Sequence, residues 1–250
     1  MKRQGNLLQL IADPDNLRLA FYKAKKGKSF KRDVLRFQNN LQTNLKEIRA
    51  SLLTGSFVPS EYNKFIVFEP KRREICTVKF KDRVLHHAIM NVCEERFEKY
   101  QIDTSYACRQ GRGVDSAILK AQTYCRKYKW FLKLDIHKYF DSIDHFILIE
   151  LLDRLFKDEQ LLEIFWKIIE SYQTTADRGI PIGNLTSQYF ANMYLARMDH
   201  YLKENLKVPG HVRYMDDFII FSNDKSFLKK TSVWLALPSA LPRRPFCVLI

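Results

Sequence analysis

Two adjacent acidic residues, Asp216 and Asp217, lie between two short apolar runs in the last fifth of the chain. The runs span residues 212–215 and 218–221, a pattern that predicts two strands joined by a tight turn with both carboxylates at its tip. Two anions held this close repel each other, so a bare acidic pair at a hairpin tip indicates a site for a divalent cation. The alternative is a solvent-exposed Asp-Asp turn, because aspartate is a common turn former.

A third acid, Asp135, lies near the end of an apolar stretch that predicts a strand over residues 130–136. If this strand pairs with the acidic hairpin, the carboxylates of Asp135, Asp216 and Asp217 meet. Three such groups cannot all stay ionised without a counter-charge. Two Mg²⁺ ions about 3.5–4 Å apart would supply it, activating an attacking hydroxyl and stabilising the leaving oxygen. The constellation therefore predicts phosphoryl or nucleotidyl transfer.

The order of the predicted elements is typical of an α+β fold with an antiparallel sheet. Apolar residues at spacings of three and four predict helices, and alternating apolar residues predict strands. The predicted helices cover residues 31–54, 81–98, 114–127, 145–156, 158–171 and 186–205. The predicted strands cover residues 62–68, 75–78 and 130–136, ahead of the acidic hairpin.

The chain carries a formal net charge of +14, which favours a polyanionic partner and nucleic acid above all. The excess is concentrated in residues 1–50, which contain 12 Lys and Arg against 4 Asp and Glu. Lys25, Lys26 and Lys28 belong to this region, and we expect them to contact nucleic acid. For a single charge run the alternative is a solvent-exposed helix face.

The remaining composition indicates a reduced compartment and no membrane segment. Five cysteines without a CxxC spacing predict free thiols in a cytoplasmic protein, and the six histidines show no zinc spacing. No signal peptide and no apolar run near 18 residues is present. Residues 247–250 superficially fit a prenylation box, which we interpret as a coincidence.

Two motifs resemble those of a known enzyme family. Residues 131–141, Phe-Leu-Lys-Leu-Asp-Ile-His-Lys-Tyr-Phe-Asp, resemble the first palm motif of reverse transcriptases, and residues 214–217, Tyr-Met-Asp-Asp, resemble their Tyr-x-Asp-Asp box. A Pro-x-Gly loop lies between them, and the resemblance extends over about residues 60–222. It implies a right-hand fingers and palm, and an RNA-directed DNA polymerase that extends a primer or cDNA with dNTPs on a template RNA.

The resemblance also implies roles for individual residues. The metal ligands for two Mg²⁺, with Mn²⁺ as an alternative ion, would be the catalytic Asp135, Asp216 and Asp217 and the backbone carbonyl of Ile136. Lys71 and Arg73 match the basic fingers residues that grip the incoming triphosphate, with an exposed basic turn as the alternative. Phe140 lies where the family places an aromatic steric gate against the ribose 2′-hydroxyl, with a core phenylalanine as the alternative.

Residues 106–113, Tyr-Ala-Cys-Arg-Gln-Gly-Arg-Gly, resemble the family's Arg-x-Gly-Arg segment at the junction of fingers and palm. The glycines of such a segment let the backbone approach a ligand or template closely. The resemblance therefore places Arg109 and Arg112 against the template or nucleotide.

The loop before the predicted helix at 186–205 differs from most of the family. Relatives read Pro-Gln-Gly, whereas this chain has Ile182 ahead of Gly183, followed by Ser187 and Gln188. This pattern is similar to the reverse transcriptases of diversity-generating retroelements, which copy a template RNA with errors at adenines. The resemblance places Ile182, Gly183 and Gln188 near the incoming nucleotide. An isoleucine cannot donate the hydrogen bonds of a glutamine, so a looser check on the nascent base pair is expected.

Two other interpretations remain open. One is a different bacterial reverse transcriptase, such as a group II intron or retron enzyme. The other is a non-catalytic RNA-binding scaffold that keeps only the basic surface. The resemblance further implies a bacterial or phage-encoded protein in the cytoplasm and a small basic accessory protein as a partner.

The sequence after Lys230 departs from the family, because no lysine-bearing palm end, primer grip or helical thumb is recognisable there. Three prolines within residues 238–245 cannot continue a helix. We therefore expect a truncated end, weak or absent processive synthesis, and a chain without a thumb. The predicted organisation is a basic helical region at 1–56, fingers and their junction at 57–129, a palm at 130–224 and an aberrant, poorly packed tail at 225–250.

Overall fold

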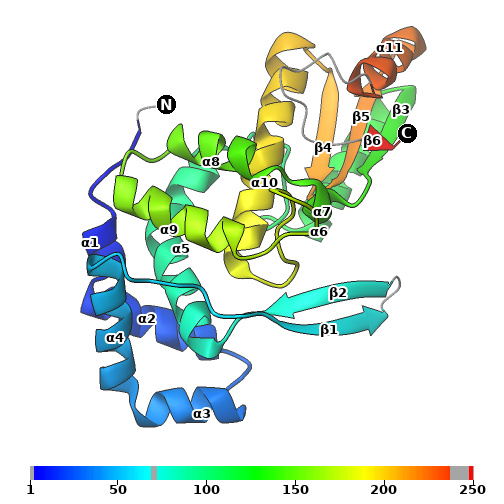
Figure 1. Ribbon diagram of the computed structural model, residues 1–250. Helices are drawn as coiled ribbons and strands as arrows, with labels where there is room; N and C mark the ends of the chain where they lie inside the picture. Colours follow the sequence, from blue (N-terminus) through cyan, green and yellow to red (C-terminus); the bar gives the residue numbers. More distant parts are fainter. Residues whose placement is uncertain (1–2, 69–71, 237–247, 250) are drawn as a thin grey trace.

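The computed structural model describes residues 3–68, 72–236 and 248–249 of the chain (Figure 1). The helices are α1 (Leu8–Ile11), α2 (Pro14–Lys25), α3 (Arg32–Asn39), α4 (Leu41–Leu53), α5 (Phe80–Tyr100), α6 (Val114–Lys127), α7 (Tyr139–Ser142), α8 (His145–Asp153), α9 (Glu159–Glu170), α10 (Leu185–His200), the π-helical turn η1 (Tyr201–Asn205) and α11 (Lys225–Ala236). The strands are β1 (Asn63–Phe68), β2 (Arg72–Thr77), β3 (Trp130–Ile136), β4 (Gly210–Tyr214), β5 (Asp217–Ser222) and β6 (Val248–Leu249).

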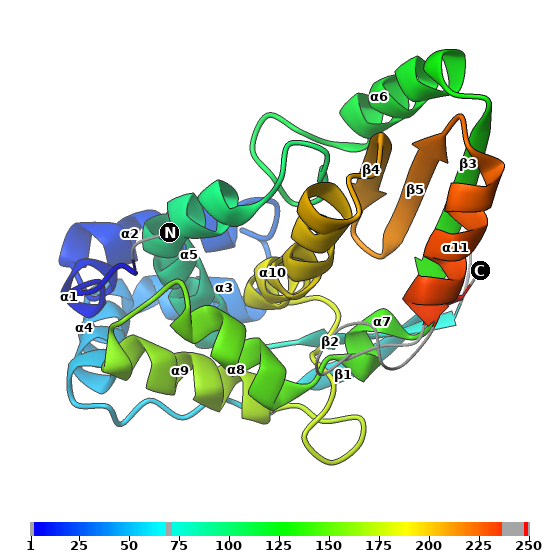
Figure 2. The same ribbon diagram turned by 90° about the horizontal axis from the view of Figure 1, so that it is seen from above.

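Strands β3 to β6 form one antiparallel sheet in the order β4-β5-β3-β6. Along β3 the side chains alternate, so that Leu134 and Ile136 are buried while Asp135 is exposed on the opposite face. The buried side of the sheet shares one hydrophobic cluster with α10, which Figure 2 shows between the sheet and the helices α5, α8 and α9. This arrangement of helices and antiparallel strands confirms the predicted α+β fold class.

Strands β1 and β2 form a separate antiparallel hairpin. Asn63 pairs with Thr77 at the base of the hairpin, and Phe68 pairs with Arg72 near its turn. Lys71 lies outside the described residues. Figure 1 shows the hairpin extending from the end of the molecule that contains α1–α5 and running beneath the four-stranded sheet.

The two longest helices, α5 with 21 residues and α10 with 16, form the centre of the core. Ile89 and Phe97 of α5 and Phe190 and Met193 of α10 are buried in one contiguous cluster. The rings of Phe97 and Phe190 lie 6.3 Å apart. Among the described residues, no helix is both long and apolar enough to cross a membrane.

The single helix predicted over residues 31–54 is wrong, because the chain forms two helices, α3 and α4, that meet at Asn40. Asn40 has φ −116° and ψ 35°, outside the helical range. Asparagine competes poorly as a helix-interior residue because its side chain favours local backbone contacts, and here Asn39 and Asn40 are adjacent. Val34 and Ile48 are nevertheless both buried, which explains why the apolar spacing runs across the break.

The expectation of a poorly packed tail is wrong for residues 225–236, which form α11. The carboxylate of Asp224 accepts hydrogen bonds from the backbone N–H groups of Ser226 (2.7 Å) and Phe227 (3.2 Å) at the start of this helix. Leu228 and Leu235 are buried in the main hydrophobic cluster, and α11 packs on β3 and β5. Residues 237–247 and 250 lie outside the described part of the chain.

The packing of α11 gives a test of this correction. Leu228 is 5% exposed, so Leu228→Ala should lower the free energy of unfolding by about 2–4 kcal/mol through lost burial and the cavity left behind. Val233 of the same helix is 56% exposed, and Val233→Ala should change it by less than about 0.5 kcal/mol. Urea unfolding followed by circular dichroism measures both. Equal, small effects would show that α11 does not belong to the core.

Candidate active site

Asp135, Asp216 and Asp217 are brought together by the pairing of β3 with β5. Leu134 pairs with Phe218, so Asp135 and Asp217 are each the next residue beyond this pair, on neighbouring strands. Tyr214 pairs with Asp217 across the β4–β5 hairpin, which places Asp216 in its two-residue turn. The strand pairing and the tight turn predicted from the sequence are therefore both present.

The charges of the three acids act on one another. The pKa of Asp216 is raised, first by burial and then by the neighbouring carboxylates of Asp135 and Asp217. The positive charge of Arg73, on β2 of the β1–β2 hairpin, acts in the opposite direction and lowers the pKa of Asp216. Lys133 of β3 also contributes positive charge, with its Nζ 3.7 Å from an oxygen of Asp217. The site thus combines acids on the sheet with cations beside and opposite them.

The donor set has the chemistry that magnesium requires, since Mg²⁺ binds carboxylate oxygens and a raised carboxylate pKa is what a bound cation would reverse. In the described part of the chain, however, no three His, Cys, Asp or Glu side chains form a ready-made metal cage. One oxygen of Asp135 accepts a hydrogen bond from the backbone N–H of Ile136 (3.0 Å). The backbone of Asp135 and Ile136 also pairs with β6. The three carboxylates therefore match Mg²⁺ or Mn²⁺ in ligand type and occupy neighbouring backbone positions, but their side chains do not form a metal-binding group here.

A buried ion pair supports the acidic turn from beneath. Arg213 is fully buried in β4, and its Nε donates to both oxygens of Asp199 on α10 (2.9 and 2.8 Å). Its Nη1 donates to the backbone carbonyl of Met215 (2.9 Å), the residue directly before Asp216. Met215 has φ +55°, a left-handed conformation that is unfavourable for a methionine. The guanidinium therefore holds a strained backbone position next to the acids.

The same guanidinium connects the turn to the segment that precedes α6. Nη1 of Arg213 also donates to Asn192 Oδ1 (3.0 Å), and the amide nitrogen of Asn192 donates to the carbonyl of Ala107 (2.7 Å). The backbone N–H of Tyr106 donates to the carbonyl of Arg213 (3.0 Å). His211 lies nearby, and burial lowers its pKa to about 4 against the opposing charge of Asp199.

Sequence reasoning missed this network, although two signals for it existed. Arg213 interrupts an apolar strand, and Asp199 lies on a helix that is buried on nearly every side. Charged residues in such positions are rarely fully buried unless they are paired. Their apolar neighbours indicate that each residue needs a partner, but only the contacts in the structure show that the two pair with each other.

The loop at residues 179–184, between α9 and α10, contacts the β1–β2 hairpin. The carbonyl of Ile182 accepts a hydrogen bond from the backbone N–H of Cys76 in β2 (2.8 Å). Gly183 has φ +118°, and a Cβ there would lie 2.6 Å from the carbonyl oxygen of Cys76, so only glycine fits. Ile182 itself is half-buried. Two of the predicted nucleotide-contacting residues thus lie at the junction of the hairpin and the palm.

Two further predicted residues have partners within the protein. Phe140 is half-buried in α7, packs against the main core, and its carbonyl accepts from the N–H of Ile180 (3.0 Å). Its position is compatible with both the steric gate and the core phenylalanine. Gln188 lies on α10, and its Oε1 accepts from the thiol of Cys108 at 3.6 Å. Gln188 therefore contacts the segment before α6.

The structure corrects the expectation that Arg109 faces the template or nucleotide. Arg109 is only 9% exposed, and its Nε and Nη2 donate to the carboxylate of Glu98 at 2.6–2.9 Å. Its Nη1 donates to the carbonyls of Ile102 and Ser105. These contacts hold the guanidinium against α5 and the loop between α5 and α6. Arg112 lies over the ring of Tyr106 and donates to the carbonyl of Asp103.

Lys25, Lys26 and Lys28, which the sequence predicts to contact nucleic acid, lie at the end of the molecule that contains α1–α5 (Figure 1). Lys25 is the last residue of α2, and its Nζ donates to Gln38 of α3 (2.8 Å). Lys26 is exposed, and Lys28 lines a pocket at the base of the β1–β2 hairpin. The structure therefore places this lysine group apart from the acidic turn.

Comparison with known families places the chain in one class. Residues 68–235 match the family described as reverse transcriptase (RNA-dependent DNA polymerase). This match covers more than half of the chain and includes the β1–β2 hairpin turn, β3 and the acidic hairpin. The chain belongs to the reverse transcriptase family.

Individual relatives agree with this assignment. The group II intron-encoded protein LtrA of Lactococcus lactis subsp. cremoris is 26% identical over 171 residues, covering 64% of this chain and 28% of LtrA. Protein YkfC of Escherichia coli (strain K12) is 28% identical over 182 residues, covering 67% of this chain and 47% of YkfC. The chain thus spans less than half the length of either relative.

Solved telomerase structures share the fold. Telomerase from Candida albicans, in complex with a TWJ fragment of telomeric RNA, has a TM-score of 0.55 at 13% identity, covering 73% of this chain and 40% of the telomerase. Apo telomerase from Candida tropicalis has a TM-score of 0.56 at 13% identity, covering 76% and 43%. At this identity the similarity concerns the arrangement of elements alone.

The buried ion pair can be tested by removing one partner. Arg213→Met leaves the carboxylate of Asp199 buried and unpaired, so the free energy of unfolding should fall by about 3–5 kcal/mol. Arg3→Met breaks an ion pair with Asp153 in which both side chains are about half exposed, and should cost less than about 1 kcal/mol. Urea unfolding compares the two substitutions directly.

A double variant separates the charge from the packing. Adding Asp199→Leu to Arg213→Met removes the uncompensated charge and should recover part of the lost stability. If Arg213→Met costs no more than Arg3→Met, the pair does not support the acidic turn.

Proposed function

We propose that this chain is the polymerase core of an RNA-directed DNA polymerase, which extends a primer or cDNA with dNTPs on a template RNA. The observation that supports it most directly is the juxtaposition of Asp135 with Asp216 and Asp217, opposite Arg73, in a chain of the reverse transcriptase family. The net charge of +14 is compatible with template RNA and primer as partners.

In this proposal Asp135, Asp216 and Asp217 hold two divalent ions, Mg²⁺ or Mn²⁺, with the carbonyl of Ile136 as a further ligand. Bound there, the ions would lower the pKa of the primer 3′-hydroxyl and neutralise charge on the leaving pyrophosphate. The protein itself contributes by holding the three acids in position. Arg213 orients the acidic turn through the Met215 carbonyl, and the strand pairing sets the separation of the acids.

The fingers hairpin supplies the cations for the incoming triphosphate. Arg73 already acts electrostatically on Asp216, so a triphosphate between them would meet positive charge on one side and metal-bound carboxylates on the other. Lys71 is assigned the same role from the sequence. Phe140 is assigned to exclude a ribose 2′-hydroxyl, and Gly183 allows the hairpin and palm backbones to approach each other.

For the subtype, we propose the error-prone enzyme of a diversity-generating retroelement. The support is Ile182 in the position where relatives have glutamine, with Ser187 and Gln188 after it. A small basic accessory protein is part of this proposal. A group II intron-type enzyme is the second candidate, favoured by the similarity to LtrA.

The metal-ligand assignment predicts loss of catalysis without loss of fold. Asp216→Asn keeps the shape of the side chain but removes a charge, so primer extension on an RNA template with Mg²⁺ should fall by about 10³-fold or more. Asp177→Asn changes an exposed acid with φ +57°, which asparagine tolerates, and should leave the rate unchanged. An Asp216→Asn protein that polymerises at the wild-type rate contradicts the proposal. A wild-type protein that binds RNA but does not extend a primer supports the scaffold interpretation instead.

The subtype predicts a specific error pattern. Ile182→Gln restores a hydrogen-bonding side chain beside the nascent base pair, so misincorporation opposite template adenines should fall about fivefold or more, the effect of about one hydrogen bond. Sequencing of cDNA made on one defined template measures the rate at each base. Unchanged adenine errors would remove the role of Ile182. A wild-type enzyme that is accurate at adenines would favour the group II intron-type candidate.

A further inference from the structure

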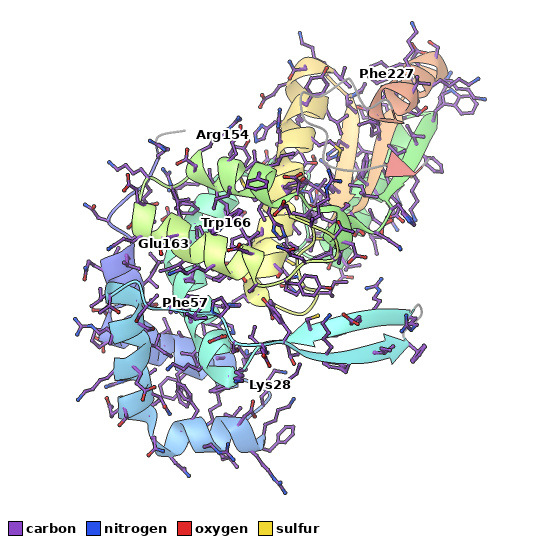
Figure 3. The ribbon with its side chains drawn as sticks, in the orientation of Figure 1. Lys28, Phe57, Arg154, Glu163, Trp166 and Phe227 are labelled. Atoms are coloured by element: carbon purple, nitrogen blue, oxygen red, sulfur yellow. The ribbon has the colours of Figure 1, made fainter. Side chains whose placement is uncertain are left out.

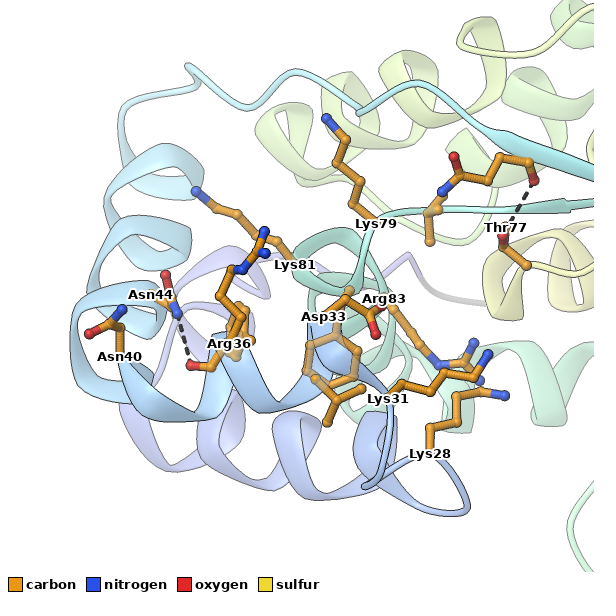
Figure 4. A pocket seen from close by; sticks show the side chains of 15 residues that line it. Lys28, Lys31, Asp33, Arg36, Asn40, Asn44, Thr77, Lys79, Lys81 and Arg83 are labelled. Atoms are coloured by element: carbon orange, nitrogen blue, oxygen red, sulfur yellow. Dashed lines mark hydrogen bonds between the residues drawn. The ribbon is translucent and has the colours of Figure 1, made fainter.

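A strongly basic pocket of about 600 Å³ lies at the base of the β1–β2 hairpin, apart from the acidic turn (Figure 4). Its walls come from the loop after α2, from α3 and the first residues of α4, from both hairpin strands and from the start of α5. The cations among its lining residues are Lys28, Lys31, Arg36, Lys79, Lys81 and Arg83. Asp33 is the one acid among those lining residues.

Three of the cations converge on one point of the pocket. Figure 4 shows the side chains of Lys28, Lys31 and Arg83 ending close together. Arg83 has the largest effect on Lys28, whose pKa it lowers, and Lys31 adds to it. The buried Nε of Arg83 has no hydrogen-bond partner among the described residues. Asp33 offsets part of this charge, since it acts on both Lys28 and Arg83, but three cations and an unused donor still favour an anion with several acceptor oxygens.

Two helices begin at this pocket, and each also has an acid in its first turn, Asp33 in α3 and Asp82 in α5. The residue before α3 is Lys31, and the residue before α5 is Lys79. Neither accepts a side-chain capping hydrogen bond from its helix. The first-turn N–H groups of a helix carry partial positive charge and bind phosphate when no side chain caps them. Lys81 is less available to bind an anion, because its Nζ forms an ion pair with Oε2 of Glu47 at 2.9 Å.

An exposed aromatic residue narrows the choice of anion. Phe30 lies between Lys28 and Lys31 in the loop after α2, and 77% of its surface is exposed. Proteins that bind single-stranded nucleic acid combine cations along the backbone with aromatic side chains on which bases stack. A free phosphate makes no use of such a ring, and the bases of a duplex are already stacked on one another, whereas those of a single strand are free to stack on it. The surroundings therefore fit a flexible single strand.

We infer that this pocket binds the backbone phosphates of single-stranded RNA, with Lys28, Lys31 and Arg83 on the phosphates and Phe30 stacked on a base. The choice of RNA as the polyanion rests on the proposed function. One hairpin connects the pocket with the acidic turn: Asn63 and Thr77 line the pocket, and Arg73, farther along β2, acts electrostatically on Asp216. An RNA strand bound at the pocket would therefore lie at the base of the β1–β2 hairpin, the element that also carries Arg73.

The test removes two pocket charges and compares a matched pair elsewhere. Lys28→Gln with Lys31→Gln is measured against Lys229→Gln with Lys230→Gln, two exposed lysines of α11. Figure 3 shows Lys28 at the base of the hairpin and Phe227 of α11 at the opposite end of the molecule. Both double variants lose the same net charge, so a difference between them reports the site.

The readout is fluorescence anisotropy of a labelled 12-nucleotide unstructured RNA over a range of monovalent salt, without divalent metal or dNTP. Two lost phosphate contacts should reduce the slope of log K against log salt by about 1.4, and affinity at 0.1 M salt should fall about 25-fold. The control pair should change affinity by less than about threefold. Equal effects of the two double variants overturn the inference. Binding is read without catalysis, so this result does not depend on whether primers are extended.

Two further arms identify the ligand. Phe30→Ala should weaken RNA binding about fivefold or more while leaving the salt slope unchanged, because stacking is not electrostatic. An unlabelled triphosphate, ATP, should compete with the RNA only at concentrations where simple salt of equal ionic strength does. If ATP competes more strongly than that and Phe30→Ala has no effect, the pocket is a site for free nucleotides and the RNA assignment is wrong.

Discussion

The candidate active site depends on a single buried ion pair. Asp199 and Arg213 are both fully buried, and desolvating two charges is costly unless hydrogen bonds satisfy them. Here the guanidinium has more to do than neutralise Asp199, because it also donates to the backbone just before the acidic turn. The repulsion among Asp135, Asp216 and Asp217 would push that turn away from β3. A rigid anchor beneath it keeps the three carboxylates within reach of one another.

Positive charge lies both at the base of the β1–β2 hairpin and nearer its turn, which agrees with the proposed function. The base of the hairpin borders a pocket rich in lysine and arginine, whereas Arg73, nearer its turn, acts on Asp216. The three acids of the palm lie close together in a chain whose Lys and Arg outnumber its Asp and Glu by 42 to 28. A polyanion would be attracted over much of the surface and would need metal ions only at the acids.

Local patterns predicted most of the fold and part of the site. The alternation along β3 and the apolar runs around the acid pair were enough to place Asp135 beside the hairpin, because strand periodicity determines which face a side chain occupies. The break at Asn40 was missed since apolar spacing continues across it. Arg213 and Arg109 were misjudged or overlooked for one reason: a charged residue is normally exposed, and only three-dimensional contacts reveal its buried partner. Residues 225–236 were judged by the prolines that follow them, although their own apolar spacing is helical.

The hydrogen bond from the Cys76 N–H to the Ile182 carbonyl fixes the β1–β2 hairpin near its base to the loop at residues 179–184. Gly183 leaves no room for a side chain of its own, so the backbone of β2 approaches the loop at residues 179–184 closely enough for this hydrogen bond to form. Arg73 lies three residues farther out, a reach of about 10 Å along a strand. In the proposed function Arg73 binds the triphosphate from the part of β2 that extends beyond this contact, whereas the part next to Cys76 is fixed to the loop at residues 179–184.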